Sequence, residues 1–345
     1  MSRSRTLLGV FLVLTLLVWV ATAPRWIFRH MLPSEWIALL LFLGMVSIVY
    51  IVAAWLIVES ILRRLTGLNG PASHRMVWFR RAVLGLSVIG LGCMAYGYFL
   101  EPYWPEVTHV PITSPKLRGA SRPVRIVHIS DLHSDPKPRL EERLPALIAN
   151  QKPDLIVFTG DAINSPAALP ILRRCLTRLS ELAPTFVVKG NFEALTWQGI
   201  EPFAGTGTRE LDGEIDALAV AGVVINIAGV ALAHEDKLRP TSASLPPDKF
   251  NLFLFHTPDQ IENVIAYNVD LYCAGHIHGG QVALPIYGAL VVLSRYGKRF
   301  ERGRHRVGDT WLYVNRGIGM EGFSAPRVRF WARPEITVYV LTAAP

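Results

Sequence analysis

Residues 271–281, LYCAGHIHGGQ, place two histidines two positions apart at the end of an apolar run and follow them with a glycine pair. Side chains at positions i and i+2 of an extended segment point to the same side, so His276 and His278 present two imidazoles in one direction. Neutral imidazole is a common metal ligand. A histidine pair also occurs as an ordinary surface feature, so the rest of the chain has to supply further ligands.

Four other short apolar runs, rich in β-branched residues, end in polar residues. RIVHIS (125–130) precedes Asp131 and His133, LIVFT (155–159) precedes Asp161, TFVVK (185–189) precedes Asn191, and NLFLF (251–255) precedes His256. Such runs predict strands, and helical spacing over residues 139–151 and 167–182 predicts a β-α-β-α-β opening. Sheets of this type carry their sites at the carboxyl ends of the strands. Beyond residue 210, strand-like stretches predict a second sheet packed on the first.

The side chains that follow these strands form a mixed nitrogen and oxygen set: Asp131, His133, Asp161, Asn191, His256, His276 and His278. This set suits Mn, Fe, Zn or Co better than Ca. Seven ligands exceed the number that one open catalytic metal uses. They fit two divalent ions that share a carboxylate.

The first hundred residues differ from the rest of the chain. Residues 6–23, 36–62 and 82–100 are apolar runs long enough to cross a bilayer as helices. Residues 1–100 carry nine Arg and two Glu, which leaves a net charge of +1 for residues 101–345. We expect a membrane anchor of about three transmembrane helices over 1–100, a linker over 101–121 and a folded domain over 122–345. The basic excess lies on the anchor, which argues against nucleic acid as a partner.

Arginines near the apolar runs predict the orientation of this anchor. Arg3 and Arg5 precede the first run, and residues 63–81, between the second and third runs, contain five arginines. The positive-inside rule places both segments in the cytoplasm. A multi-pass protein of the inner (cell) membrane follows, with its large domain on the periplasmic or extracellular side. Residues 1–23 also fit a signal peptide, and that alternative leaves the domain on the same side.

The polar motifs, in the order Asp-x-His, Gly-Asp, Gly-Asn, His and Gly-His-x-His, resemble the calcineurin-like metallophosphoesterases. The resemblance covers about residues 122–343. The later stretches GHIHGGQVALP, LYVNRGIGMEG and RPEITVYVL are similar to the membrane-associated branch with the YkuE and YaeI phosphodiesterases and a UDP-2,3-diacylglucosamine hydrolase. The resemblance implies an α/β fold, a four-layered α/β/β/α sandwich preceded by transmembrane helices, with a dinuclear metal centre.

The resemblance also implies a role for each candidate ligand. Asp131, His133 and His278 would hold the first ion; Asn191, His256 and His276 would hold the second; Asp161 would bridge them. Asp161, Asn191 and His256 are in addition the candidate catalytic residues. Two ions, of which manganese is one candidate, can activate water and neutralise phosphate oxygens during in-line attack.

One position departs from the family pattern. Many relatives have histidine, which acts as a general acid, where this chain has Phe192. Phenylalanine cannot donate a proton, so we expect a leaving group that is already a weak base, such as the phosphate of a pyrophosphate. Glu193 is a candidate replacement acid, although a solvated and ionised side chain is the simpler interpretation.

Three functional hypotheses follow. The first is a membrane-anchored hydrolase of a phosphodiester or pyrophosphate bond, with membrane lipids as partners and a phosphorylated lipid or small molecule as substrate. The second is a UDP-2,3-diacylglucosamine hydrolase of lipid A synthesis that faces the cytoplasm, which requires the opposite topology. The third is a weakly catalytic module that binds metal or lipid.

Several other polar and aromatic residues have two interpretations. His128 is expected in the core, and His234 is a weaker candidate for the site. The one basic cluster of the large domain fits either anionic headgroups and a substrate phosphate or a solvated hairpin; it comprises Arg295, Lys298, Arg299, Arg302, Arg304 and Arg306. Phe323 and Trp331 are expected in the core or at a membrane rim.

Overall fold

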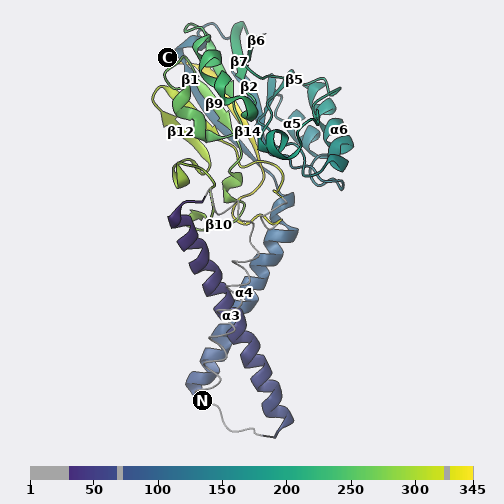
Figure 1. Ribbon diagram of the computed structural model, residues 1–345, viewed down its shortest axis with the longest axis vertical. Coiled ribbons are helices and arrows are strands. Elements are labelled where there is room, and N and C mark those ends of the chain that lie inside the picture. The colour runs from purple at the N-terminus through teal and green to yellow at the C-terminus, as the bar shows by residue number, and fades with distance from the viewer. Residues whose placement is uncertain (1–30, 68–72, 322–326, 345) are drawn as a thin grey trace. The chain divides into compact units, whose positions relative to one another are not determined.

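A computed structural model describes residues 31–67, 73–321 and 327–344. The chain divides into two compact units, Met1–Tyr98 and Phe99–Pro345 (Figure 1). The predicted first apolar run at 6–23, the possible signal peptide at 1–23, the arginines that precede residue 31, and Phe323 lie outside the described residues.

The first unit contains two long apolar helices, α3 (Pro33–Leu65) and α4 (His74–Phe99). Both are long and apolar enough to cross a membrane. The predicted run 36–62 lies inside α3, and α4 begins before the predicted run 82–100 and ends with it. The two helices are joined by an ion pair between Glu59 and Arg80, at 3.0 Å. Most of their large apolar side chains are exposed.

The second unit contains two six-stranded sheets. The first sheet has the order β1-β14-β2-β3-β4-β5, with β2, β3, β4 and β5 parallel. Its strands are β1 (Glu106–Ser114), β14 (Glu335–Ala343), β2 (Val124–Ile129), β3 (Leu155–Phe158), β4 (Thr185–Val187) and β5 (Arg209–Glu210). The connecting helices α5 (Leu144–Ala149) and α6 (Leu169–Ser180) lie inside the two predicted helical segments. The predicted β-α-β-α-β opening is therefore confirmed.

The second sheet has the order β12-β13-β9-β8-β7-β6, with β7, β8 and β9 parallel. Its strands are β6 (Glu214–Val220), β7 (Val223–Gly229), β8 (Phe250–Leu254), β9 (Leu271–Ala274), β12 (Gly303–Val307) and β13 (Thr310–Val314). A short helix, α7 (Leu238–Ala243), follows β7, and a separate hairpin pairs β10 (Ala283–Leu284) with β11 (Gly288–Ala289). The second sheet was also predicted.

Side chains along a strand point alternately to the two faces of the sheet, and the apolar runs are continuous because both faces are buried. In β2, Val124 and Ile126 join a cluster that also contains Ile225 and Leu252 of the second sheet. Val127 points the other way, into a cluster with side chains of α5 and α6. A strand that is buried on both faces has no solvent side and reads as an apolar run. One apolar cluster therefore lies between the two sheets.

The linker prediction over residues 101–121 is wrong for the segment that forms β1. This strand pairs in parallel with β14 along its whole length, from Glu106↔Glu335 to Ser114↔Ala343. Val110, Ile112 and Ser114 are buried on one face. Proline suggested a linker, but β1 is an edge strand, and an edge strand tolerates Pro111 because one row of its N–H groups needs no ladder partner.

Candidate metal centre

Each predicted ligand follows the carboxyl end of a strand. Asp131 and His133 follow β2, Asp161 follows β3, Asn191 follows β4, His256 follows β8, and His276 and His278 follow β9. Because neighbouring strands in each sheet are parallel here, their polar ends gather at one edge. The structure brings all seven side chains into two adjoining groups.

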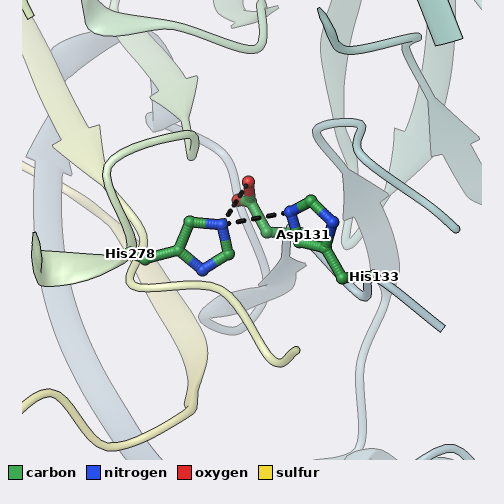
Figure 2. A group of neighbouring side chains, drawn as sticks. All are labelled: Asp131, His133 and His278. Atoms are coloured by element: carbon green, nitrogen blue, oxygen red, sulfur yellow. Dashed lines mark hydrogen bonds and ion pairs between the residues drawn. The ribbon is translucent and has the colours of Figure 1, made fainter. Parts of the chain in front are cut away.

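The first group consists of Asp131, His133 and His278, and Figure 2 shows the three side chains converging. The Nε2 atoms of His133 and His278 are 3.1 Å apart. Nε2 of His278 is 3.4 Å from Oδ1 of Asp131. All three residues are buried. Three potential ligand atoms therefore face one point inside the protein.

The second group consists of Asp161, His256 and His276, with Asn191 beside them. Nε2 of His256 lies 3.3 Å from Oδ2 of Asp161 and 2.9 Å from Oδ1 of Asn191. The same Asp161 oxygen lies 3.6 Å from Nε2 of His133 in the first group. Asp161 therefore stands between the two groups, where a shared carboxylate would be needed.

These spacings fit bound divalent ions. Ligand atoms that surround one ion at about 2.0–2.2 Å lie about 3.0–3.5 Å from one another. The Nε2 atoms of His133 and His278, 3.1 Å apart, share a hydrogen bond whose proton a bound cation would replace. The donor set of imidazoles, carboxylates and one amide oxygen suits borderline metals.

Three of the four imidazoles in the site are uncharged near pH 7, whereas the charge of Asp161 outweighs burial and raises the pKa of His256 to about 10. Burial lowers the pKa of His133 and of His276 to about 4 and lowers the pKa of His278 well below its usual range. These imidazoles are therefore neutral near pH 7 and keep a lone pair for a metal. Burial opposes the ionisation of Asp161, but neighbouring His256 and His133 outweigh it and lower its pKa. Burial raises the pKa of Asp131 to about 7.

The backbone holds the candidate ligands in an unusual conformation. Five of them have positive φ: Asp131 at 50°, His133 at 40°, Asp161 at 57°, His276 at 70° and His278 at 54°. Such angles are costly for residues with a side chain and persist where the surroundings enforce them. Here the amides of Asp131 and His133 donate to the carbonyls of Gly160 and Asp161, at 2.9 and 3.0 Å.

Gly275 shows why glycine precedes the histidine pair. A Cβ atom at this position would collide with the side chains of Ser130 and Asp131. Without it, the amide of His276 approaches the Asp131 carboxylate and donates to both oxygens, at 3.1 and 3.0 Å. The glycine therefore lets the end of β9 close on the end of β2.

Comparison with known proteins agrees with this geometry. Residues 124–280 match the calcineurin-like phosphoesterase family. The metallophosphoesterase YkuE of Bacillus subtilis (strain 168) is 33% identical over 265 residues, which cover 71% of this chain and 89% of YkuE. The chain belongs to the calcineurin-like phosphoesterases. It is a metal-dependent phosphoester hydrolase, as its sequence predicted.

Two further relatives belong to the branch that the sequence suggested. Phosphodiesterase YaeI of Escherichia coli (strain K12) is 29% identical over 259 residues, covering 71% of this chain and 92% of YaeI. The UDP-2,3-diacylglucosamine pyrophosphatase LpxG of Chlamydia muridarum is more distant, at 24% identity over 300 residues, covering 69% of this chain and 90% of LpxG.

Glu193 of this phosphoesterase is a buried support and not a solvated side chain. Its carboxylate accepts hydrogen bonds from the amides of Asp161 (3.0 Å), Ala162 (2.8 Å) and Gly190 (2.8 Å). Only 5% of the residue is exposed. Burial, and then the charge of Asp161, raises its pKa. Glu193 therefore fixes the loops after β3 and β4, and the solvated interpretation of the sequence was wrong.

Phe192 lies against the first ligand group. Its ring packs edge-on to that of His133, with the centroids 4.5 Å apart. Its amide donates to Oδ1 of Asp161, at 2.9 Å, so its backbone supports the site while its side chain carries no proton. The phosphoesterase therefore has an apolar ring next to its candidate metal ligands.

Two supporting residues had no signal in the sequence. Oδ1 of Asn164 lies 3.1 Å from Nδ1 of His133 and so orients Nε2 of that imidazole toward the site. Arg329 is fully buried, donates to the carbonyls of Gly319, Arg316 and Ala332, and lies 3.1 Å from Nδ1 of His278. Each lies in a segment with no motif of its own.

Two further histidines that the sequence singled out, His128 and His234, have different surroundings from the candidate ligands. His128 is fully buried between the hydroxyls of Tyr339 (2.8 Å) and Thr159 (2.9 Å), which confirms it as a core residue. His234 is exposed and pairs with Asp212 at 2.6 Å. His234 is not a member of either ligand group.

Proposed function

We propose that this phosphoesterase is anchored in a membrane and cleaves a phosphodiester or pyrophosphate bond in a phosphorylated lipid, or in another substrate close to the membrane surface. The observation that carries the proposal is the pair of ligand groups joined by Asp161, next to the apolar ring of Phe192. The first feature suits attack at phosphorus, and the second suits a leaving group that needs no proton.

In this proposal, Asp131, His133 and His278 hold one divalent ion, and Asn191, His256 and His276 hold the other. Asp161 serves both, and Asp161, Asn191 and His256 are the residues closest to the chemistry. Two such ions, with Mn, Fe, Zn and Co as candidates, supply Lewis acidity that lowers the pKa of water and neutralises phosphate oxygens. The chain contributes neutral imidazoles at His133, His276 and His278, an ionised Asp161 and the loops that Glu193 fixes.

Phe192 indicates which kind of leaving group the site favours. An alkoxide is a strong base and needs a proton as the bond breaks, whereas the phosphate of a pyrophosphate needs little help. The Glu193 carboxylate is occupied by three backbone amides and does not replace the missing acid. A diester or anhydride is therefore favoured over an unactivated monoester.

The anchor is the segment over residues 1–100, which includes α3 and α4. Their exposed apolar side chains support membrane insertion. Arg63, Arg64, Arg75, Arg80 and Arg81 lie at or between the facing ends of the two helices in sequence. The positive-inside rule puts these arginines in the cytoplasm and the second unit on the periplasmic or extracellular side. We infer a four-layered α/β/β/α arrangement for this unit.

Hydrolysis of two model substrates tests the proposal. The detergent-purified chain is supplied with Mn²⁺ and with bis-p-nitrophenyl phosphate or p-nitrophenyl phosphate. We expect faster turnover of the diester, and loss of about a thousandfold or more in Asp161→Ala, since metal ions supply several kcal/mol of transition-state stabilisation. Turnover that survives in a folded Asp161→Ala variant, or a preference for the monoester, would contradict the proposal.

The similarity to LpxG favours a second candidate, hydrolysis of UDP-2,3-diacylglucosamine at the cytoplasmic face. Release of UMP from this substrate by the purified chain would support it. Its topology is tested separately by fusing alkaline phosphatase or green fluorescent protein after residue 345. Fluorescence without phosphatase activity would favour the cytoplasmic candidate, and the reverse would exclude it.

A further inference from the structure

The hairpin of β10 and β11 ends in an exposed apolar tip. Ile286, in the loop between the two strands, is fully exposed, at 109% of its reference area. Its φ is 70°, a left-handed conformation that is especially unfavourable for a β-branched residue. Glycine or asparagine would occupy this position at a lower cost. A strained isoleucine that none of the described residues of the second unit covers points to a partner that contacts it.

A second residue with the same two properties lies beside this hairpin. Trp331 is 55% exposed and has φ of 57°. It is held next to β10 because the amide of Ala283 donates to the carbonyl of Phe330, at 2.8 Å. Two large apolar side chains in costly conformations therefore stand on neighbouring segments of one surface.

This surface is tied to the residues that directly follow α4. The Glu101 carboxylate accepts hydrogen bonds from the amides of Trp331 (2.9 Å) and Ala332 (2.6 Å). The Arg333 guanidinium lies 4.3 Å from the ring centroid of Trp104, which is itself 57% exposed. The chain therefore enters this surface within a few residues of the end of a helix long enough to cross a membrane.

Cations accompany the exposed rings. Nζ of Lys298 lies 4.0 Å from the ring centroid of Tyr287 at the hairpin loop and donates to the carbonyl of Ala289. The nearby acid, Glu301, is paired with Lys298 at 3.2 Å and also accepts the amide of Ala289, so it adds no free negative charge. Arg299 is exposed beside Lys298. Aromatic rings with adjacent cations are typical of the bilayer interface.

The predicted basic cluster is thus divided. The guanidinium groups of Arg304 and Arg306, on the edge strand β12, each lie 4.7 Å from the centroid of the Trp311 ring and not at the hairpin. Arg302 instead donates to the carbonyl of Trp331, at 2.9 Å. Only part of the cluster accompanies the exposed apolar residues.

We propose that Trp104, Ile286, Tyr287, Lys298, Trp331 and Arg333 form an interfacial rim that inserts into the surface of the bilayer holding α3 and α4, with anionic headgroups against its cations. This inference rests on the proposed membrane anchor. The rim adjoins the metal centre, because β10 begins five residues after His278 and because Arg329 contacts both His278 and Ala332. Substrate phosphates at the headgroup level would then lie beside the candidate metal ligands.

Fluorescence quenching tests the contact without using activity. Full-length chain is reconstituted in nanodiscs of phosphatidylcholine and phosphatidylglycerol and labelled on one cysteine with an environment-sensitive dye. Cys175 and Cys273 are buried, so Cys93 is the accessible site, and Cys93→Ser provides the background for Ile286→Cys and Trp331→Cys. Val224→Cys, on β7, is the control, because β6 and β7 lie at the opposite end of the second unit from β10 in Figure 1.

We expect lipids that carry a quencher near the headgroup to remove about half or more of the signal at positions 286 and 331, since interfacial side chains enter the bilayer by about 5–10 Å. The signal at position 224 should be unaffected. The dye on native Cys93 reports the anchor. Quenching at Cys93 with none at positions 286 and 331 would overturn the rim and leave the anchor; no quenching at any position would overturn both. Lys298→Glu with Arg333→Glu should reduce quenching, and an unchanged signal would overturn the role of the cations.

Discussion

The candidate metal centre and the proposed interfacial rim both contain residues with left-handed backbone angles, but the surroundings of these residues differ. Asp131 and His133 are buried and their amides are bonded to neighbouring loops. Ile286 and Trp331 have similar φ values and are exposed. Strain persists where the surroundings enforce it. The fold itself enforces the conformation of the first pair, whereas among the described residues of the second unit nothing covers Ile286 and only about half of Trp331 is covered.

Arg329 connects the two regions, and its removal should have the largest effect on stability. The buried guanidinium donates to the carbonyl of Gly319 beside the metal centre and to that of Ala332 beside the rim. Arg329→Met leaves these carbonyls unpaired, so we expect the free energy of unfolding to fall by about 3–5 kcal/mol. Denaturant unfolding in detergent measures it. Arg327→Met, which removes a half-exposed ion pair with Asp135, is the control and should cost about 1 kcal/mol or less.

Glu193→Gln tests whether the fold enforces the conformation of the metal loops. A Gln side chain keeps the size but replaces one acceptor oxygen by a donor, which opposes the amides of Asp161, Ala162 and Gly190. We expect a loss of about 2–3 kcal/mol in unfolding free energy and slower diester hydrolysis. Glu201→Gln removes an exposed carboxylate that pairs with Lys189 and should change neither. Equal behaviour of the two variants would show that the loops hold their shape without Glu193.

The sequence predicted the converging side chains well because each of them follows a recognisable local pattern. A strand that is buried on both faces is an apolar run, and the polar residue that ends it must lie at the sheet edge, as at Asp131 and His256. Residues whose importance comes from distant contacts gave no such signal. Asn164 meets His133 across 31 positions, and Arg329 meets His278 across 51.

Two errors have the same origin. Proline made residues 101–121 look like a linker, yet β1 is fixed by pairing with β14 more than two hundred residues away. Glu193 looked solvated because it is charged and sits after a strand, and only the folded chain surrounds it with three amides. Pairing partners of this kind depend on topology, which one sequence does not specify locally.

Asn164→Ala tests how much metal affinity depends on the orientation of His133. The His133 imidazole remains, but the partner of its Nδ1 is lost. Removing such a partner lowers metal affinity or activity by about 10- to 100-fold. Calorimetric titration of metal into the chelator-treated protein measures the loss. Asn268→Ala, which removes one hydrogen bond to the carbonyl of Leu245 at an exposed site, should leave the affinity unchanged; a tight site in Asn164→Ala would mean that packing alone orients His133.

The smallest expected effect is an increase in the free energy of unfolding, whereas the preceding variants lower stability or metal affinity. Ile286→Asn places a residue that tolerates left-handed angles at the hairpin tip, so in detergent the free energy of unfolding should rise by about 1 kcal/mol. Val224→Asn is the matched control, since Val224 is also exposed and β-branched but is not among the residues with positive φ. In nanodiscs the gain at position 286 should shrink, because isoleucine then contacts lipid and asparagine does not. If both variants lose stability equally in detergent, Ile286 is not strained. In that case the rim would carry no backbone strain at Ile286 to compare with the strained backbone of the candidate metal ligands.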